Sequence, residues 1–340
     1  MNRSGWRSHL TALITAMITC ICLLSLSTAP AWAKVGKITE FPVPSGSPEF
    51  ITVGPDGNLW FTEEAGVIGR ITTSGKITEF PTSTPVNMGI MAGPDGNLWF
   101  AEFQGNKIGR ITTAGLVTGE FSLPTSCGST SGCEPEGITA GSDGNLWFTE
   151  LNGNRIGRIT PSGVITEFPL PTSCGSTSGC APEGITAGPD GNVWFTERAG
   201  NNIGRITTSG KITEFPIPTA SSLPEGITTG PDGALWFAEF NVGNIGRITT
   251  SGSITAFPVA KTGPFGITTG PDGNLWFTLS FGNSIGRITT TGSFTSFTLP
   301  TTCQNKFGCT PLGITAGPAK TSDVWFTEFR GAKIGRITTQ

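Results

Sequence analysis

The chain has 340 residues, with 49 glycines, 25 prolines and a formal net charge of −3. Such a composition suits many short strands joined by tight turns, and the length allows one large repeat domain. The chain carries no basic stripe, which argues against a nucleic-acid-binding protein.

Residues 1–33 have the order of a secretory signal peptide. They begin with two arginines, continue with the apolar stretch Leu10–Leu26 and end in Ala31-Trp32-Ala33, an A-x-A cleavage pattern. We therefore expect a secreted or periplasmic mature chain that starts at Lys34 and has no membrane span. An uncleaved membrane anchor is the alternative, although the apolar stretch is short for a span. Removal of the segment takes away two arginines and no acid, so the net charge becomes −5.

Seven copies of one sequence repeat follow. The cleanest copy, Gly184–Pro216, reads G-I-T-A-G-P-D-G-N-V-W-F-T-E and, after a short turn, N-N-I-G-R-I-T-T-S-G-K-I-T-E-F-P. Each copy holds four short runs of strand-forming residues separated by turn residues. Its tryptophan recurs every 39 to 49 residues, which is about the length of one propeller blade. The tryptophans are Trp60, Trp99, Trp147, Trp194, Trp236, Trp276 and Trp325. The pattern predicts an all-β fold over residues 34–340, a single-domain seven-bladed β-propeller with four-stranded antiparallel blades.

The two ends of the mature chain complete one blade between them. The last copy stops at Ile334–Thr338, a third strand with no fourth strand after it. The mature chain begins with Lys37–Pro42, which reads as a fourth strand with no blade before it. We expect the N-terminal strand to join the last blade and close the ring, because closure removes open sheet edges.

Six cysteines of the mature chain form three closely spaced pairs between blades. In an exported protein such pairs predict disulfides within each loop, and a metal site is the alternative, although no histidine is present to complete it. The pairs are Cys127 with Cys133, Cys174 with Cys180, and Cys303 with Cys309.

The arginine of Ile-Gly-Arg-Ile-Thr occurs in all seven copies. A turn centred between Ser74 and Gly75 places Arg70 opposite Glu79 on the neighbouring strand. Opposite charges across a strand pair stabilise a sheet, so we expect a structural role rather than a ring of anion sites. The same register predicts Arg158 with Glu167, Arg205 with Glu214, and Arg336 with Glu40. The tryptophan and phenylalanine of the second strand are predicted to form the core between blades.

Ten further glutamates are predicted to gather at one end of the central channel. The start of the first strand and the end of the second lie at one sheet edge, because the two strands are antiparallel. The first strands contribute Glu49, Glu136, Glu183 and Glu225, and the second strands contribute Glu63, Glu102, Glu150, Glu197, Glu239 and Glu328. Crowded carboxylates favour a bound cation such as Mg²⁺ or Ca²⁺, unless each one bonds to backbone N–H groups and serves the fold. The Asp-Gly-Asn turns are a less favoured alternative for calcium.

The repeat P-x-G-I-T-x-G-P-D-G-N-L-W-F-T-E with N-x-I-G-R-I-T resembles the streptogramin B lyase family, also called virginiamycin B lyases. The resemblance implies a propeller that opens a cyclic depsipeptide by elimination, with a histidine base and Mg²⁺. It assigns the metal to Glu134, in the closest match Glu134-Pro135-Glu136-Gly137, and to Glu150, which ends the following strand. Glu136 stands where the family has its histidine, which makes it the candidate catalytic base. By blade order the site would instead fall at Phe265, Leu312 and Leu279.

The only histidine in the chain is His9, which lies inside the predicted signal peptide. A glutamate is a weaker base unless its surroundings raise its pKa. Three hypotheses follow for a protein expected to be monomeric. The first is a binding or scaffold propeller for a cation, small molecule, peptide or glycan; the others are a metal-dependent lyase and a lactonase-type hydrolase. The missing histidine separates the first hypothesis from the second.

Overall fold

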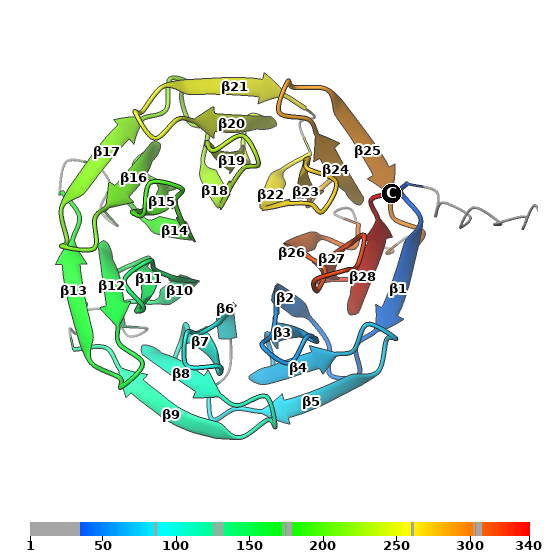
Figure 1. Ribbon diagram of the computed structural model, residues 1–340, viewed down its shortest axis with the longest axis horizontal. Helices are drawn as coiled ribbons and strands as arrows, with labels where there is room; N and C mark the ends of the chain where they lie inside the picture. The colour runs from blue at the N-terminus through cyan, green and yellow to red at the C-terminus, as the bar shows by residue number, and fades with distance from the viewer. Residues whose placement is uncertain are drawn as a thin grey trace, which may run out of the picture. The chain divides into compact units, whose positions relative to one another are not determined.

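The computed structural model describes residues 35–84, 87–124, 127, 132–171, 174, 179–259, 262–301, 303 and 308–340. The predicted signal peptide lies outside these residues. Twenty-eight strands form seven four-stranded antiparallel sheets, which stand as blades around a central channel (Figure 1). The predicted seven-bladed propeller is confirmed. Within the described ranges, no helix is long and apolar enough to cross a membrane.

The blades follow one another along the chain, and the first strand of each lies innermost (Figure 1). Blade 1 contains β2 (Pro48–Val53), β3 (Leu59–Glu63), β4 (Val67–Ile71) and β5 (Ile77–Pro81). Blade 2 contains β6 (Asn87–Ala92), β7 (Leu98–Glu102), β8 (Lys107–Ile111) and β9 (Val117–Ser122). Blade 3 contains β10 (Pro135–Ala140), β11 (Leu146–Glu150), β12 (Arg155–Ile159) and β13 (Ile165–Pro169). Blade 4 contains β14 (Pro182–Ala187), β15 (Val193–Glu197), β16 (Asn202–Ile206) and β17 (Ile212–Pro216).

The remaining blades repeat this order. Blade 5 contains β18 (Pro224–Thr229), β19 (Leu235–Glu239), β20 (Asn244–Ile248) and β21 (Ile254–Pro258). Blade 6 contains β22 (Pro264–Thr269), β23 (Leu275–Leu279), β24 (Ser284–Ile288) and β25 (Phe294–Thr298). Blade 7 contains β26 (Pro311–Ala316), β27 (Asp323–Glu328), β28 (Lys333–Thr338) and β1 (Ile38–Pro42).

The second strand of each blade supplies the core between neighbouring blades. Trp60 is fully buried and packs with Ile90 and Phe100 of blade 2, whereas Phe61 faces the other way and packs with Trp325 of blade 7. Gly69 of the third strand makes room for this packing, because a Cβ atom there would lie 2.1 Å from the Phe61 ring. The prediction that these aromatic residues form the core is confirmed.

The predicted arginine–glutamate pairs are wrong by one residue. Arg70 lies opposite Thr78, and Glu79 lies opposite Gly69. The turn is one residue longer than a Ser-Gly hairpin, since the Thr72 N–H donates to the Lys76 carbonyl and Gly75 has a φ of +95°. A one-residue change of register moves a side chain to the other face of the sheet. The same correction holds for Arg158 with Thr166, Arg205 with Thr213, and Arg336 with Thr39.

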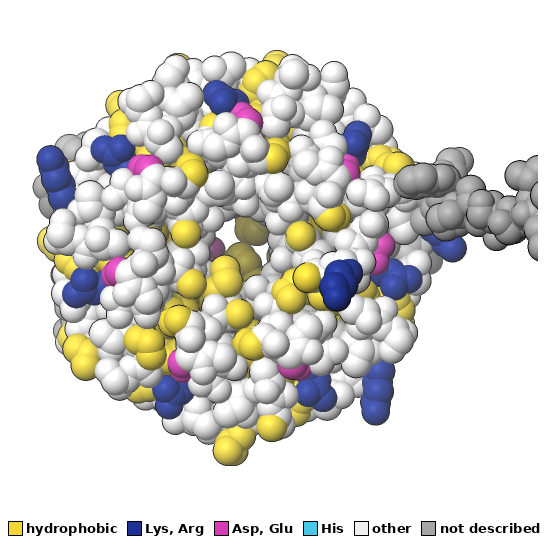
Figure 2. Space-filling view, in the orientation of Figure 1, with side chains coloured by type: hydrophobic (Ala, Val, Ile, Leu, Met, Phe, Trp, Pro, Cys, Tyr) yellow, Lys and Arg dark blue, Asp and Glu magenta, His cyan; other side chains and the backbone are white. Residues whose placement is uncertain are grey.

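The arginine has a structural role through different contacts. The Arg70 guanidinium lies 5.5 Å from the ring centroids of Trp60 and Phe80, and its Nη1 donates to the Thr113 carbonyl of blade 2 at 2.9 Å. Asp56 accepts a hydrogen bond from the Trp60 indole at 3.0 Å and lies 3.9 Å from the Arg70 side chain. Arg110, Arg158, Arg205 and Arg336 make the same link to a carbonyl group of the next blade. Arg247 and Arg287 bond instead to Asp232 and Asp272 of their own blades. Figure 2 shows basic and acidic side chains side by side around this face of the ring.

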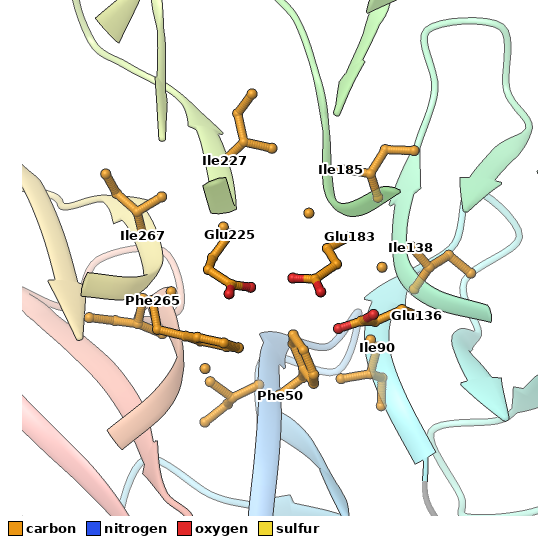
Figure 3. A pocket seen from close by; sticks show the side chains of 18 of the residues that line it. Phe50, Ile90, Glu136, Ile138, Glu183, Ile185, Glu225, Ile227, Phe265 and Ile267 are labelled. Carbon is orange, nitrogen blue, oxygen red and sulfur yellow. The ribbon is translucent and has the colours of Figure 1, made fainter. Parts of the chain in front are cut away.

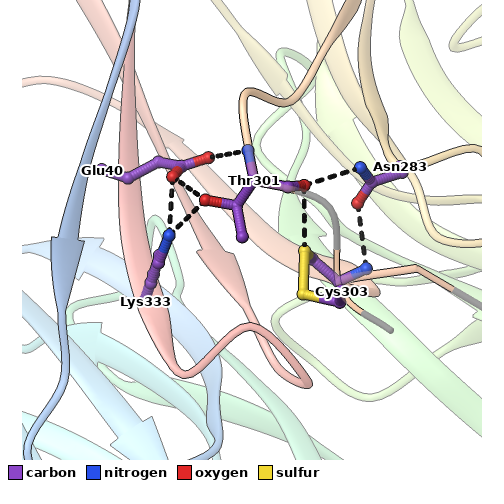
Figure 4. Close-up of a disulfide and its surroundings, with 6 residues drawn as sticks. Glu40, Asn283, Thr301, Cys303 and Lys333 are labelled. Carbon is purple, nitrogen blue, oxygen red and sulfur yellow. Dashed lines mark hydrogen bonds and ion pairs between the residues drawn. A yellow bond between two sulfur atoms is a disulfide. The ribbon is translucent and has the colours of Figure 1, made fainter. Parts of the chain in front are cut away.

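The N-terminal strand closes the ring as predicted. β1 pairs with β28, and Phe41 stacks on Trp325 with ring centroids 5.7 Å apart. Lys333 Nζ lies 2.8 Å from Glu40 Oε2, and both side chains bond to Thr301 in the loop before blade 7 (Figure 4). Blade 7 is therefore held by segments from both ends of the chain.

All three predicted disulfides are present. Cys127–Cys133, Cys174–Cys180 and Cys303–Cys309 each close one loop between blades. An asparagine of the preceding blade anchors the second cysteine of each pair through its side-chain oxygen, as Asn283 does for the Cys309 N–H at 2.9 Å (Figure 4). Asn106 and Asn154 do the same for Cys133 and Cys180, both at 2.7 Å.

Deletion of residues 34–44 should expose the edge of β28 and leave Trp325 without the Phe41 ring. Unpaired strand edges promote association between chains. We expect a lower melting temperature and aggregation, measured by circular dichroism and light scattering. A deletion variant as stable and monodisperse as the parent would remove the argument for ring closure.

Candidate functional site: the carboxyl-lined end of the channel

The seven first strands surround a cavity of about 180 Å³ on the channel axis. Much of its wall is apolar, because the isoleucine of Gly-Ile-Thr, or its equivalent, lines it from every blade. These residues are Ile51, Ile90, Ile138, Ile185, Ile227, Ile267 and Ile314. Polar chemistry at the cavity therefore depends on the residues next to these isoleucines.

Glycine brings neighbouring first strands very close together. A Cβ atom on Gly137 would lie 2.5 Å from the Glu183 carbonyl oxygen, and one on Gly184 would lie 2.5 Å from that of Glu225. Thr149 stabilises one such contact. Its hydroxyl accepts a hydrogen bond from the Gly137 N–H at 2.9 Å and donates one to the Glu183 carbonyl at 2.8 Å. The glutamate before each glycine is thus held against its counterpart in the next blade.

Three of the predicted glutamates converge on the cavity. Glu136, Glu183 and Glu225 come from blades 3, 4 and 5, and their carboxyl groups point toward one another (Figure 3). Arg198, at the end of β15, lies 3.4 Å from Glu183 and 3.0 Å from Glu225. One guanidinium thus stands beside three carboxyl groups, so the cluster has too little positive charge to balance its full ionisation.

The carboxyl groups of this cluster hold their protons more tightly than free glutamates do. Burial raises the pKa of Glu136 well above its ordinary value, and the charge of Glu183 adds to this, while Arg198 opposes it. Burial also raises the pKa of Glu225, with a further contribution from its hydrogen bond and repulsion with Glu183. A cation placed among them would favour the ionised forms.

Aromatic side chains form the opposite side of the cavity. Figure 3 shows Phe50 and Phe265 across the opening from Glu183 and Glu225. Phe240 packs edge-on against Phe265 with centroids 6.3 Å apart, and Phe281 lies 5.2 Å from Phe240. Phe281 is 49% exposed, so the aromatic surface continues from the cavity toward solvent.

The glutamates of the second strands do not line the cavity, which corrects the prediction of ten channel carboxylates. All six are fully buried, and none belongs to the cavity wall: Glu63, Glu102, Glu150, Glu197, Glu239 and Glu328. Antiparallel pairing places these glutamates at the expected edge of the sheet, but it does not decide the direction of their side chains. Side chains alternate along a strand, so Glu63 shares the face of Phe61, which packs toward the preceding blade. Glu49 is also buried and lies outside the wall of the cavity.

These buried carboxyl groups belong to the blade repeat. In most blades the second-strand glutamate lies near a glutamate of the fourth strand. In blades 2, 3 and 7 a basic side chain at the start of the third strand lies beside both glutamates. Those cations are Lys107, Arg155 and Lys333. Burial, followed by the charge of the fourth-strand glutamate, raises the pKa of Glu63 and of Glu328 to about 8.

The proposed metal ligands Glu134 and Glu150 gain little support from this geometry. The Glu150 carboxylate and the two Cys127–Cys133 sulfur atoms lie within 4.8 Å of one another, but oxidised sulfur is not a ligand for Mg²⁺. Both Glu150 oxygens lack a hydrogen-bond partner, yet the same is true of Glu63, which has no Glu-Pro-Glu segment before it. The orphaned oxygens therefore follow the repeat and do not mark a metal centre.

Sequence reasoning missed Arg198 and Phe240, which both come directly after the second-strand glutamate of their blades. The signal was present in the copies, because this position changes from blade to blade while the tryptophan and phenylalanine of the preceding strand stay constant. It reads Glu64, Phe103, Leu151, Arg198, Phe240, Ser280 and Phe329. Variation within a repeat indicates where the blades differ in what they contact.

The buried second-strand carboxyls predict an unusual pH dependence of stability. Between the ordinary glutamate pKa and about 8 the folded chain binds more protons than the unfolded chain, so stability falls as pH rises through this window. The turn aspartates, whose pKa is lowered when folded, lose their contribution only in stronger acid. We expect a higher melting temperature at pH 5 than at pH 8.

The substitution Glu63→Gln should raise the melting temperature at pH 8 and change it much less at pH 5. Lys76→Gln, which removes a charge at an exposed turn of the same blade, is the control and should have little effect at either pH. Equal stability of the parent at both pH values would show that these carboxyls ionise freely.

Comparison with known proteins gives a consistent result. A family model described as the virginiamycin B lyase family matches residues 31–130, 127–263 and 175–340. A solved streptogramin B lyase is 40% identical with a TM-score of 0.80, and the match covers 89% of this chain and 98% of that one. Virginiamycin B lyase from Staphylococcus aureus is 42% identical with a TM-score of 0.79, and the match covers 89% of this chain and 99% of that one.

Two further solved structures match this chain. The Staphylococcus aureus enzyme was also solved with quinupristin in a catalytically inactive form, in which alanine replaces a histidine. A putative gluconolactonase, 15% identical with a TM-score of 0.54, covers 76% of this chain and 90% of its own and shares the fold alone. A search of the curated proteins finds no match.

Proposed function

Because the chain belongs to the virginiamycin B lyase family but has no histidine after residue 9, we propose that it is a binding propeller that recognises a positively charged ligand at the carboxyl-lined end of its channel. The ligand class includes a metal ion, a cationic small molecule, a basic peptide or an amino-glycan. One observation carries the proposal: Glu136, Glu183 and Glu225 meet at one cavity with a single arginine beside them.

The setting of the site supports this proposal. The cavity is formed by backbone positions that the blade packing fixes, so a ligand meets groups that are already in place. The three disulfides favour an oxidising compartment, which agrees with the proposed secretion or export to the periplasm. A secreted protein meets Mg²⁺, Ca²⁺ and organic cations outside the cell.

Small cations test the proposal through thermal stability. Mg²⁺, Ca²⁺ or methylammonium should each be titrated while the melting temperature is followed. A ligand that binds only the folded state stabilises it by RT ln(1 + [L]/Kd), or about 2.7 kcal/mol at a hundredfold excess over Kd. We expect a saturable rise with at least one of the three cations.

Two matched variants locate the site. Glu136→Gln keeps the shape of the side chain and removes its charge, so it should abolish the rise, whereas Glu150→Gln of the same blade should retain it. Loss of the rise in Glu150→Gln alone would place the ion at Glu134 and Glu150 instead. If none of the three cations stabilises the parent, the cluster serves the fold only.

A second candidate is the elimination reaction of the family with Glu136 as the base. The raised pKa of Glu136 favours it, because a carboxylate that holds its proton more tightly is a stronger base once ionised. In this reaction Glu136 takes a proton next to a carbonyl group, and the electron pair forms a double bond as the ester C–O bond breaks. Mg²⁺, where bound, would steady the negative charge on that carbonyl oxygen.

A streptogramin B depsipeptide with added Mg²⁺ tests this candidate. Elimination opens the ring without a change of mass, so the product is identified by its fragmentation pattern in mass spectrometry. Activity should rise with pH as Glu136 ionises and should vanish in Glu136→Gln. Intact substrate after long incubation at pH 9 would leave binding as the role of the site.

A further inference from the structure

We propose that the channel end binds a primary organic ammonium ion that carries one small apolar ring, with the nitrogen among the carboxyl groups of Glu136, Glu183 and Glu225 and the ring between Phe50 and Phe265. This inference rests on the proposed function, because it names the ligand class of the same site. It adds a requirement for an apolar group, which a bare metal ion does not meet.

The carboxyl side of the cavity offers free acceptors to such a group. Among the residues that the structure describes, none donates a hydrogen bond to the Glu136 carboxyl, which its neighbours influence only through charge and burial. Glu183 and Glu225 meet Arg198, yet a carboxylate can accept more than one donor. A primary ammonium has three N–H donors, so it can bond to Glu136 and to Glu183, whose carboxyl group lies between those of Glu136 and Glu225 (Figure 3).

The aromatic side favours an organic cation over a metal ion. Phe50 stands where the other six blades have glycine, so its ring is the one large side chain added at this level of the channel. Phenyl faces attract organic cations and pack against apolar groups. Mg²⁺ gives up its water shell reluctantly and gains little from contact with such an aromatic wall.

The size of the cavity limits the apolar group. An engineered apolar cavity of about 150 Å³ holds benzene. The cavity here measures about 180 Å³, which suits one six-membered ring joined to a methylammonium group. A longer substituent would pass along Phe240 and the half-exposed Phe281 toward solvent.

Arg198 acts as a tethered cation that competes with the ligand. Its side chain is 42% exposed while the Glu225 side chain is 4% exposed, so the arginine covers the cluster from the solvent side. When a ligand ammonium arrives, repulsion between the two positive charges weakens binding. Removal of Arg198 should therefore strengthen the binding of an ammonium ion.

Calorimetric titration of the purified secreted protein with three probes tests the inference. Benzylammonium has both features, methylammonium lacks the ring, and benzyl alcohol lacks the charge. We expect benzylammonium to bind at least about tenfold more tightly than either of the others, a difference of 1.4 kcal/mol.

Variants of the cavity give directional effects. Glu225→Gln should weaken benzylammonium binding about tenfold, and Phe50→Gly, which restores the residue of the other blades, should remove the advantage over methylammonium. Arg198→Gln should tighten benzylammonium binding roughly five- to tenfold, as expected for loss of one repelling charge. Lys211→Gln removes the same charge at an exposed turn and is the matched control.

The outcomes separate this inference from the proposed function. Equal affinity for benzylammonium and methylammonium, with both lost in Glu136→Gln, would leave a cation site and overturn the apolar requirement. Equal affinity for benzylammonium and benzyl alcohol would make the cavity a purely apolar pocket and overturn the inference. Weaker binding in Arg198→Gln would overturn the competing role of the arginine. Absence of binding by every cation, metal ions included, would overturn both proposals.

Discussion

The close approach of the first strands around the channel is the contact on which the rest of the structure depends. A Cβ atom at Gly137, Gly184 or Gly313 would lie 2.5 Å from a carbonyl oxygen of the next blade, so glycine sets the distance between blades. The residue before each of these glycines consequently stands beside its counterpart in the neighbouring blade. Where three successive copies place glutamate there, three carboxyl groups must share one small space.

The proposed site lies where the copies differ. The tryptophan, phenylalanine and arginine that recur in every blade form the interfaces between blades. The positions that differ lie at one end of the channel. In the first strands, blade 3 has Glu136 where blade 6 has Phe265, and Phe50 replaces a glycine. After the second strands, blade 4 has Arg198 where blade 5 has Phe240. The symmetric ring supplies rigidity, and the asymmetric residues supply a charged side and an apolar side.

The repeat predicted the architecture well because the relevant signals are local. Gly57 and Gly75 supply positive φ values at the turns, and the unfinished last copy required the strand at Lys37–Pro42 to close the ring. The cysteine spacing likewise predicted the pairing of Cys127 with Cys133. Each of these features depends on a few neighbouring residues.

Features that depend on direction or on small register changes were harder to predict. One extra turn residue moved Arg70 from Glu79 to Thr78, and strand alternation turned Glu150 away from the channel. Antiparallel pairing fixes the edge at which a side chain lies, but the face depends on packing between blades. Arg198 reaches the site from beyond the end of a strand, where no periodicity constrains it.

The most direct test of the account is a crystal structure of the protein grown with benzylammonium. We predict electron density for the nitrogen within hydrogen-bond distance of the Glu136 carboxylate and of Glu183 or Glu225, with the ring between Phe50 and Phe265. Density for the ligand only elsewhere on the molecule, or an empty cavity at saturating ligand, would contradict it.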